Sequence, residues 1–241
     1  MRLFLLVAAL AAAWPAAAQQ QDVRDVDAGA DRAILYSTAE THPKGTFYFS
    51  DYEIVFLQIG YAVTDSLQIS LTGVPPLVKD QPYFFDLTAK VNLLRSDFFR
   101  AAFMVAGDAV VLPKDSKPSS IFGLRLGAIG QICFEATCRT SLVLNVGTLL
   151  NDKSNEVVPL YMAASAIVRL TDLVKIMVEP NYAVAVGGGK VEGPTGFLLN
   201  YGVRLSGRQF AFDLGFIKPF GADSDEFILG FPLLTFTYRT N

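Results

Sequence analysis

Apolar and polar side chains alternate at every second position along much of this chain, most clearly between Phe197 and Phe216. The alternation is interrupted by a polar turn at Gly207-Arg208 and resumes at Phe210. A period of two indicates β-strands, because successive side chains of a strand point to opposite faces of the sheet. One face of this hairpin is so rich in aromatic residues and leucines that something apolar must cover it. The pattern therefore predicts an all-β protein.

The N-terminus has the composition of a cleaved export signal. Arg2 precedes an apolar run from Leu3 to Ala13, and the small residues Ala16 to Ala18 form a cleavage site. We expect residues 1–18 to be a signal peptide, 19–31 a flexible periplasmic lead-in, and 32–241 one β-barrel domain. After the signal no run of about 18 apolar residues occurs, so the sequence predicts no transmembrane helix. Yet 51% of the chain is hydrophobic, which predicts either a thick core or a transmembrane barrel.

Charge and cysteine content narrow the choice further. A formal net charge of -3 argues against nucleic acid as a partner. The two cysteines, Cys133 and Cys138, flank a predicted turn, and in an oxidising compartment this arrangement favours a disulfide. A zinc site would need further ligands, and the single histidine, His42, is far away in sequence.

Short and long connections alternate along the chain, as they do in up-and-down membrane barrels with short periplasmic turns and long outer loops. The expected architecture is a closed antiparallel up-and-down transmembrane β-barrel of about twelve strands. The run 46–63 is long enough to bend near Ser50-Asp51 and supply two strands instead of one. The predicted strands are 32–38, 46–63, 66–74, 83–95, 97–112, 120–134, 138–149, 157–170, 173–186, 195–206, 208–219 and 226–239.

The chain resembles bacterial outer-membrane β-barrel proteins of porin-like or uncharacterised type. The hairpin Gly60–Ser70, its relatives at 167–178 and 201–214, and the closing strand Leu234–Tyr238 carry the resemblance. It differs where Arg239, Thr240 and Asn241 follow Tyr238, since such barrels usually end on an aromatic residue. The resemblance implies an outer-membrane location and an architecture, and it transfers no functional residues.

The face expected to point into the barrel carries charge along its length. It holds more basic than acidic residues, which favours a narrow anion-selective pore because positive charge raises the local anion concentration. The alternative is a plugged interior in which the charges pair, since an unpaired buried charge is costly. The predicted lumen-facing residues are Lys90, Arg100, Arg125, Arg169, Lys175, Arg204 and Lys218, with Asp86, Asp108, Glu179 and Asp213.

No pattern in the sequence predicts catalysis. A serine nucleophile needs a base, and the only imidazole, His42, lies in a predicted loop. Gly187 to Lys190 lacks the spacing of a phosphate loop, and Asp223, Asp225 and Glu226 lack a full set of cation ligands. We therefore expect no catalytic residue, no metal and no cofactor.

The leading hypothesis is a non-enzymatic outer-membrane barrel that acts as a narrow channel for small solutes or as a structural surface protein. Its expected partners are outer-membrane lipid and lipopolysaccharide, the barrel assembly machinery and a small-molecule solute. Two alternatives stay open: a soluble periplasmic or secreted barrel that binds a lipid or another hydrophobic ligand, and an outer-membrane lipid-modifying enzyme.

Overall fold

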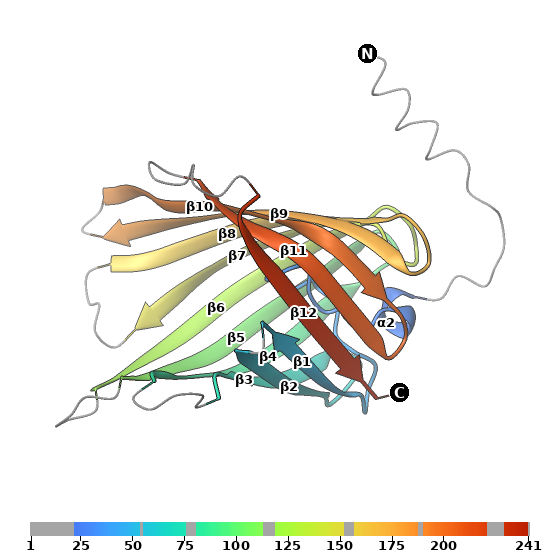
Figure 1. Ribbon diagram of the computed structural model, residues 1–241, viewed down its shortest axis with the longest axis horizontal. Helices are drawn as coiled ribbons and strands as arrows, with labels where there is room; N and C mark the ends of the chain where they lie inside the picture. The colour runs from blue at the N-terminus through green and yellow to red at the C-terminus, as the bar shows by residue number, and fades with distance from the viewer. Residues whose placement is uncertain are drawn as a thin grey trace, which may run out of the picture.

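The computed structural model describes residues 22–53, 55–75, 81–112, 119–151, 157–187, 190–220 and 229–240. They form a closed barrel in which each strand pairs with its sequence neighbours and β1 closes onto β12 (Figure 1). All pairings are antiparallel, so the predicted up-and-down barrel is confirmed. The strands are β1 Phe47–Tyr52, β2 Phe56–Ala62, β3 Leu67–Gly73, β4 Tyr83–Arg95, β5 Phe99–Leu112, β6 Ser119–Cys133, β7 Ser141–Asn151, β8 Val157–Arg169, β9 Val174–Gly187, β10 Lys190–Ser206, β11 Phe210–Phe220 and β12 Phe231–Arg239.

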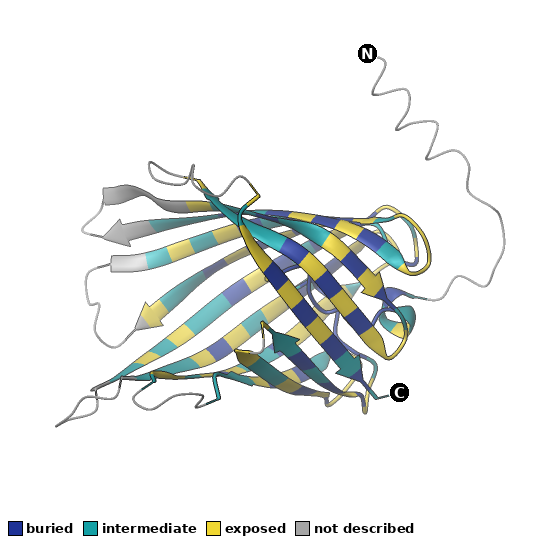
Figure 2. Ribbon diagram, viewed as in Figure 1, coloured by how far each residue is buried: buried dark blue, intermediate teal, exposed yellow. Residues whose placement is uncertain are grey.

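The alternation in the sequence becomes the two faces of the barrel wall. In β11, Phe212 and Leu214 are exposed on the outside, whereas Ala211 and Asp213 are buried on the inside. Figure 2 shows the same alternation of buried and exposed residues along the neighbouring strands. Arg204 of β10 lies directly opposite Asp213 in the register. The hairpin with the clearest pattern therefore forms as predicted.

The count of twelve strands is confirmed, but the first predicted strand is wrong. Residues 32–38 are not part of the wall but lie inside the barrel, where they form one isolated bridge, between Arg32 and Ser37. The run 46–63 supplies both β1 and β2, and β1 continues through Ser50-Asp51 to Tyr52, so the turn comes later than predicted. Glu53 makes this turn with a φ of 60°, and its backbone N–H donates to the carbonyl of Leu234 at 3.0 Å.

Residues 22–46 lie inside the barrel, at the end where the short turns are (Figure 1). They contain the single helical turn α2, Val23–Val26, whose N-cap Asp22 accepts a hydrogen bond from the Arg24 N–H at 3.0 Å. Residues 22–31 were expected to form a flexible lead-in, but they are packed against the wall, and Ala28 and Asp27 are almost fully buried. The predicted signal peptide, residues 1–18, lies outside the described residues.

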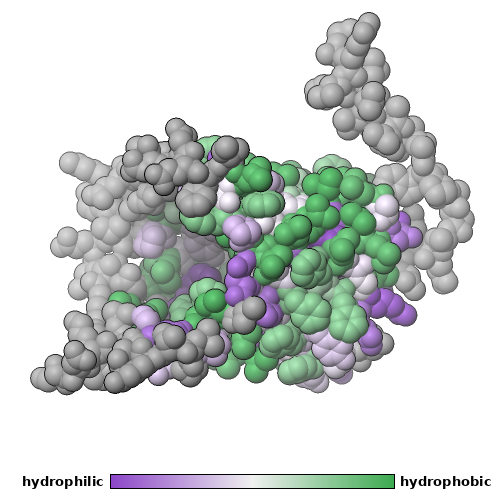
Figure 3. Space-filling model, viewed as in Figure 1, coloured by the Kyte–Doolittle hydropathy of each residue, from purple (hydrophilic) through white to green (hydrophobic). Residues whose placement is uncertain are grey.

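Large hydrophobic side chains cover the outside of the barrel, and Figure 3 shows them as a broad apolar surface over the strands. The wall is not equally high all round. Strands β4 to β11 have 11 to 17 residues. In contrast, β1 has 6, β2 and β3 have 7, and β12 has 9. Within the described residues, no helix is long and apolar enough to cross a membrane.

Candidate functional site

The lumen is filled at one end and open at the other. We call residues 22–46 the plug. Lumen-facing residues near the short turns are buried beneath it, for example Lys90 and Asn92 on β4. Further along the strands the inward face becomes more accessible, as at Phe84 on β4 and Arg125 on β6. We therefore distinguish a filled half, which contains the plug, from an open half beyond the plug's tip at residues 33–36.

Arg204 is the centre of the contact between plug and wall. Its guanidinium pairs with Asp213 on the neighbouring strand at 2.6 Å. It also donates to plug carbonyls, to Arg32 at 3.0 Å and to Ala33 at 2.7 Å. From the plug side, Arg32 reaches the same Asp213 at 2.5 Å. Each of these side chains is almost fully buried. Asp213 therefore pairs with two buried guanidinium groups that would each be costly to bury unpaired.

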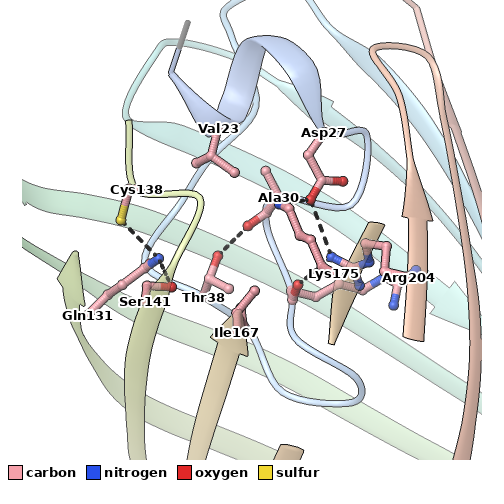
Figure 4. A pocket seen from close by; sticks show the side chains of 11 residues that line it. Val23, Asp27, Ala30, Thr38, Gln131, Cys138, Ser141, Ile167, Lys175 and Arg204 are labelled. Atoms are coloured by element: carbon pink, nitrogen blue, oxygen red, sulfur yellow. Dashed lines mark hydrogen bonds and ion pairs between the residues drawn. The ribbon is translucent and has the colours of Figure 1, made fainter. Parts of the chain in front are cut away.

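A second buried contact joins Asp27 of the plug to Lys175 of β9 (Figure 4). Burial raises the pKa of Asp27, but Lys175 and then Arg204 outweigh this effect and lower the pKa to about 2. The carboxylate also accepts a hydrogen bond from the Gly29 N–H at 2.8 Å. Asp27 is therefore held in its charged form inside the barrel.

Asp31 has a similar environment a turn further along the plug. Burial raises its pKa, but His42, Lys90 and a hydrogen bond from Gln68 together hold the pKa well below its usual range. Gln68 donates to the carboxylate at 2.8 Å, and Lys90 donates to the Asp31 carbonyl at 2.9 Å. His42 was expected in an outer loop, but its side chain is fully buried in the plug, 3.5 Å from Asp31.

The tip of the plug is held by one carboxylate from the wall. Glu179 of β9 accepts hydrogen bonds from three successive backbone N–H groups, those of Ile34 at 3.3 Å, Leu35 at 3.0 Å and Tyr36 at 3.3 Å. Ser165 and Asn200 donate to the same carboxylate at 3.0 and 2.9 Å. A carboxylate bound in this way fixes the conformation of the tip as well as its position.

The plug is also tied to the short turns. Its Val23 N–H donates to the Thr137 carbonyl at 2.8 Å, within the loop closed by the Cys133–Cys138 disulfide. Arg100 pairs with Glu40 at 2.5 Å and with the N-cap Asp22 at 2.7 Å. The predicted Cys133–Cys138 disulfide is present in the structure, and it holds a loop that contacts the plug.

Arg239, which departs from the usual aromatic ending, points inward and contacts the plug. Its guanidinium donates to the Arg24 carbonyl and lies 3.3 Å from Nδ1 of His42. Tyr238, one residue earlier, faces outward beside Phe210, with ring centroids 5.1 Å apart. The end of β12 therefore places an aromatic ring outside and a cation inside.

Little space remains between the plug and the wall. The cavity there has a volume of about 10 Å³, which is room for about one water molecule. Asp27, Lys175 and Arg204 lie around it, together with Gln131 and Ile167 (Figure 4). The plug therefore fits closely against the wall at this cavity, and the charged groups Asp27, Lys175 and Arg204 around it are paired.

The open half carries a smaller polar cluster. Arg125 on β6 contacts Asp86, and it lies 3.5 Å from Asp108. Tyr161 projects from β8 across the wall, and its ring lies 5.9 Å from that of Tyr36 at the plug's tip. The side chain of Arg125 is 34% exposed, so solvent can reach this cluster.

The structure places most of the predicted lumen residues on the inner face, but it divides them between three locations. Six contact the plug or pair within its network: Lys90, Arg100, Lys175, Glu179, Arg204 and Asp213. Arg125 with Asp86 and Asp108 lies in the open half. Arg169 lies at the rim, where it contacts Asp172.

Lys218 was wrongly assigned to the lumen. Asp213 faces inward and the register of β11 continues without a bulge, so Ile217 also faces inward and Lys218 faces outward. Its ammonium lies 5.5 Å from the ring of Phe220 on the same outer face. The error came from counting residues across the strand without keeping a strict period of two.

Sequence reasoning missed the plug residues that complete the network, namely Asp22, Asp27, Asp31, Arg32 and Glu40. One signal was present in the sequence. The predicted inner face had an excess of basic residues, and the acidic N-terminal segment carries the carboxylates that neutralise it. Recognising that match required knowing that the segment enters the barrel.

No protein-family model matches this chain, and no curated protein sequence is significantly similar to it. Among the described residues, no group of histidine, cysteine or carboxylate side chains is arranged to hold a metal ion. The predicted cation ligands Asp223, Asp225 and Glu226 lie outside the described residues. The functional argument for this chain therefore depends on its barrel, its plug and the open half of its lumen.

Proposed function

We propose that this protein is a non-enzymatic outer-membrane β-barrel that is closed at rest by its own N-terminal plug and admits small solutes only when the plug moves. The observation that carries the proposal is the buried network between plug and wall. It closes the filled half while leaving the open half accessible from the opposite end.

The outer surface supports a membrane location. Large hydrophobic side chains are exposed on every strand, including Leu87, Phe122, Leu144 and Leu214. A water-soluble barrel that held a hydrophobic ligand would have the reverse arrangement, with its apolar residues inside and its charges outside. Here most of the charged residues of the strands are inside, which favours lipid as the outer environment.

The interior favours a closed barrel over a permanently open pore. An open pore needs a water-filled path along the whole lumen, and the plug interrupts that path. The contact includes an apolar cluster in which Ile34 of the plug packs with Met177 of the wall. The rest of the contact is polar, and polar contacts can be exchanged for water when a segment moves out. A gate of this kind is consistent with a narrow channel for small solutes.

Single-channel recording in planar bilayers tests the proposal. We expect the full chain to be silent most of the time, and the double variant Asp27→Asn, Arg32→Ala to show frequent openings because two plug anchors are removed. The matched control is Asp172→Asn, which removes an exposed rim carboxylate outside the plug. A double variant that folds, as judged by heat-modifiable gel migration, and stays as silent as the control would contradict the gating proposal.

A further inference from the structure

The barrel wall has a low section formed by β12, β1, β2 and β3. All four strands begin or end at the short-turn end, as shown by the pairs Tyr48↔Arg239 and Ala62↔Gln68. Their shortness is therefore confined to the other end. A strand of 7 residues rises ~23 Å along its own axis and ~16–19 Å along a tilted barrel axis, compared with an apolar band of about 25 Å. The regular wall here is lower than the membrane it would cross.

The rim of the low section is a turn with its own hydrogen bonds. Glu53 takes a left-handed conformation to make the turn between β1 and β2. Its carboxylate accepts a hydrogen bond from the Leu234 N–H at 2.6 Å, and its own N–H donates to the Leu234 carbonyl at 3.0 Å. These two bonds satisfy backbone groups of β12 that a taller β1 would otherwise pair. The wall thus ends here with its hydrogen bonds satisfied.

Apolar side chains lie on both sides of this rim, although the rim itself carries the charged Glu53. Outside, Val55, Ile59 and Leu71 are exposed on the low section. Inside, Phe56 of β2 and Phe84 of β4 face the open half with ring centroids 6.0 Å apart in an edge-on arrangement. Phe56 remains 42% exposed although it points inward. Figure 3 shows a recess in the side of the barrel at this height, through which the interior is visible.

The path ends inside the barrel. Asp86 follows Phe84 by two residues on the same face, nearer the plug, and it holds Arg125. The tip of the plug closes the lumen below, with Leu35 still 40% exposed. An apolar chain that crosses the rim therefore meets aromatic rings first and then a charged cluster and a floor. This arrangement suits binding rather than passage to the other end.

We propose that the low section is a lateral entrance through which a hydrocarbon chain of a membrane amphiphile enters the open half and packs against Phe56 and Phe84. The occupant is a lipid chain because the low section ends within the expected height of the hydrocarbon and because the rings of Phe56 and Phe84 lie directly behind it. The inference rests on the membrane location argued above, and it adds a ligand class to the open half.

Tryptophan fluorescence with brominated lipids tests the entrance. The one tryptophan, Trp14, lies in the predicted signal peptide, so protein refolded without residues 1–18 has tryptophan only where one is introduced. Three variants are reconstituted in phosphatidylcholine with or without bromine on its acyl chains. Phe85→Trp reports the outer, lipid-facing surface, Phe56→Trp reports the lateral entrance, and Leu149→Trp reports the inner face of the high wall on β7.

We expect bromine to reduce the emission of Phe56→Trp by as large a fraction as that of Phe85→Trp, and to leave Leu149→Trp unchanged. Quenching of Phe85→Trp alone would overturn the lateral entrance and leave the membrane location intact. Equal quenching of Phe56→Trp and Leu149→Trp would also overturn it, because the chain would then not enter at the low section. Absence of quenching in Phe85→Trp would instead contradict the membrane location.

A second variant tests the same path independently of the fluorophore. Phe84→Asp in the Phe56→Trp background places a charge on the path at a position that is partly accessible, so the barrel is expected to fold. We expect the quenching of Phe56→Trp to be lost, because a hydrocarbon chain does not pack against an ionised carboxylate. Unchanged quenching in this double variant would overturn the proposed binding position.

Discussion

The two halves of this lumen are lined by the same twelve strands but differ in how their polar groups are satisfied. In the filled half, Arg204, Lys175 and Glu179 are fully buried and each is paired with the plug. In the open half, Arg125 is partly exposed, and its ion-pair partners among the described residues are the wall carboxylates Asp86 and Asp108. The difference shows that the charges of the wall are buried where the plug contacts them and stay partly exposed where it does not.

The largest expected effect is that of Arg204→Ala. The substitution leaves Asp213 and several plug carbonyls buried without their main donor, and breaking a buried ion pair in this way costs about 4 kcal/mol. We expect an equal fall in the free energy of unfolding measured in urea, together with faster proteolysis of the plug. Arg125→Ala in the open half is the comparison, and a loss as large there would contradict the distinction between the halves.

The next largest difference is expected when a large apolar side chain in each half is replaced by alanine. Met177 is fully buried beneath the plug, so Met177→Ala leaves a cavity and is expected to cost about 3 kcal/mol. Phe56→Ala removes a larger side chain, but one that is 42% exposed, and water or lipid can fill the space it leaves. We expect the smaller loss for Phe56→Ala in urea unfolding. Equal losses would show that the open half is packed as tightly as the filled half.

Acid should loosen the plug through Asp27. Its pKa is lowered from 3.8 to about 2, so its charge stabilises the plug above pH 3.8, and this contribution disappears as the pH falls through about 2. The contribution amounts to about 2 kcal/mol. We expect the stability difference between the wild-type chain and Asp27→Asn to shrink over this interval. A difference that stays constant down to pH 2 would contradict the charged contact with Lys175.

The smallest effect concerns the fit of the plug backbone. A Cβ atom at Gly29 would lie 2.9 Å from Cζ of Arg204, so Gly29→Ala must displace the guanidinium from its partners. We expect a cost of about 1 kcal/mol, because the long side chain can shift by a few tenths of an ångström. Gly207→Ala is the control, since the nearest atom there is 3.8 Å away. Equal stability of the two variants would indicate that Arg204 is held more loosely than the contacts imply.

The sequence predicted the wall better than the interior. Alternation over Phe197 to Phe216 is local information, because the period of two reports which residues share a face. The strand count was also correct, although residues 32–38 were taken as a strand and β1 and β2 as one run. A short apolar stretch such as Ala33 to Tyr36 looks the same whether it pairs in a sheet or packs inside one. Lys218 shows that one slip in the period moves a residue to the wrong side of the wall.

The sequence by itself determined that the chain forms strands with one apolar and one charged face, that the hairpins turn where they do, and that Cys133 and Cys138 can join. These properties depend on neighbours along the chain. Only the tertiary structure decided that residues 22–46 fill the barrel and that Asp27, Arg32 and Glu40 neutralise wall residues far away in sequence. It also decided that β1 to β3 leave the wall low. Contacts of that range depend on closing the barrel, and no local pattern records which segment the closed barrel will enclose.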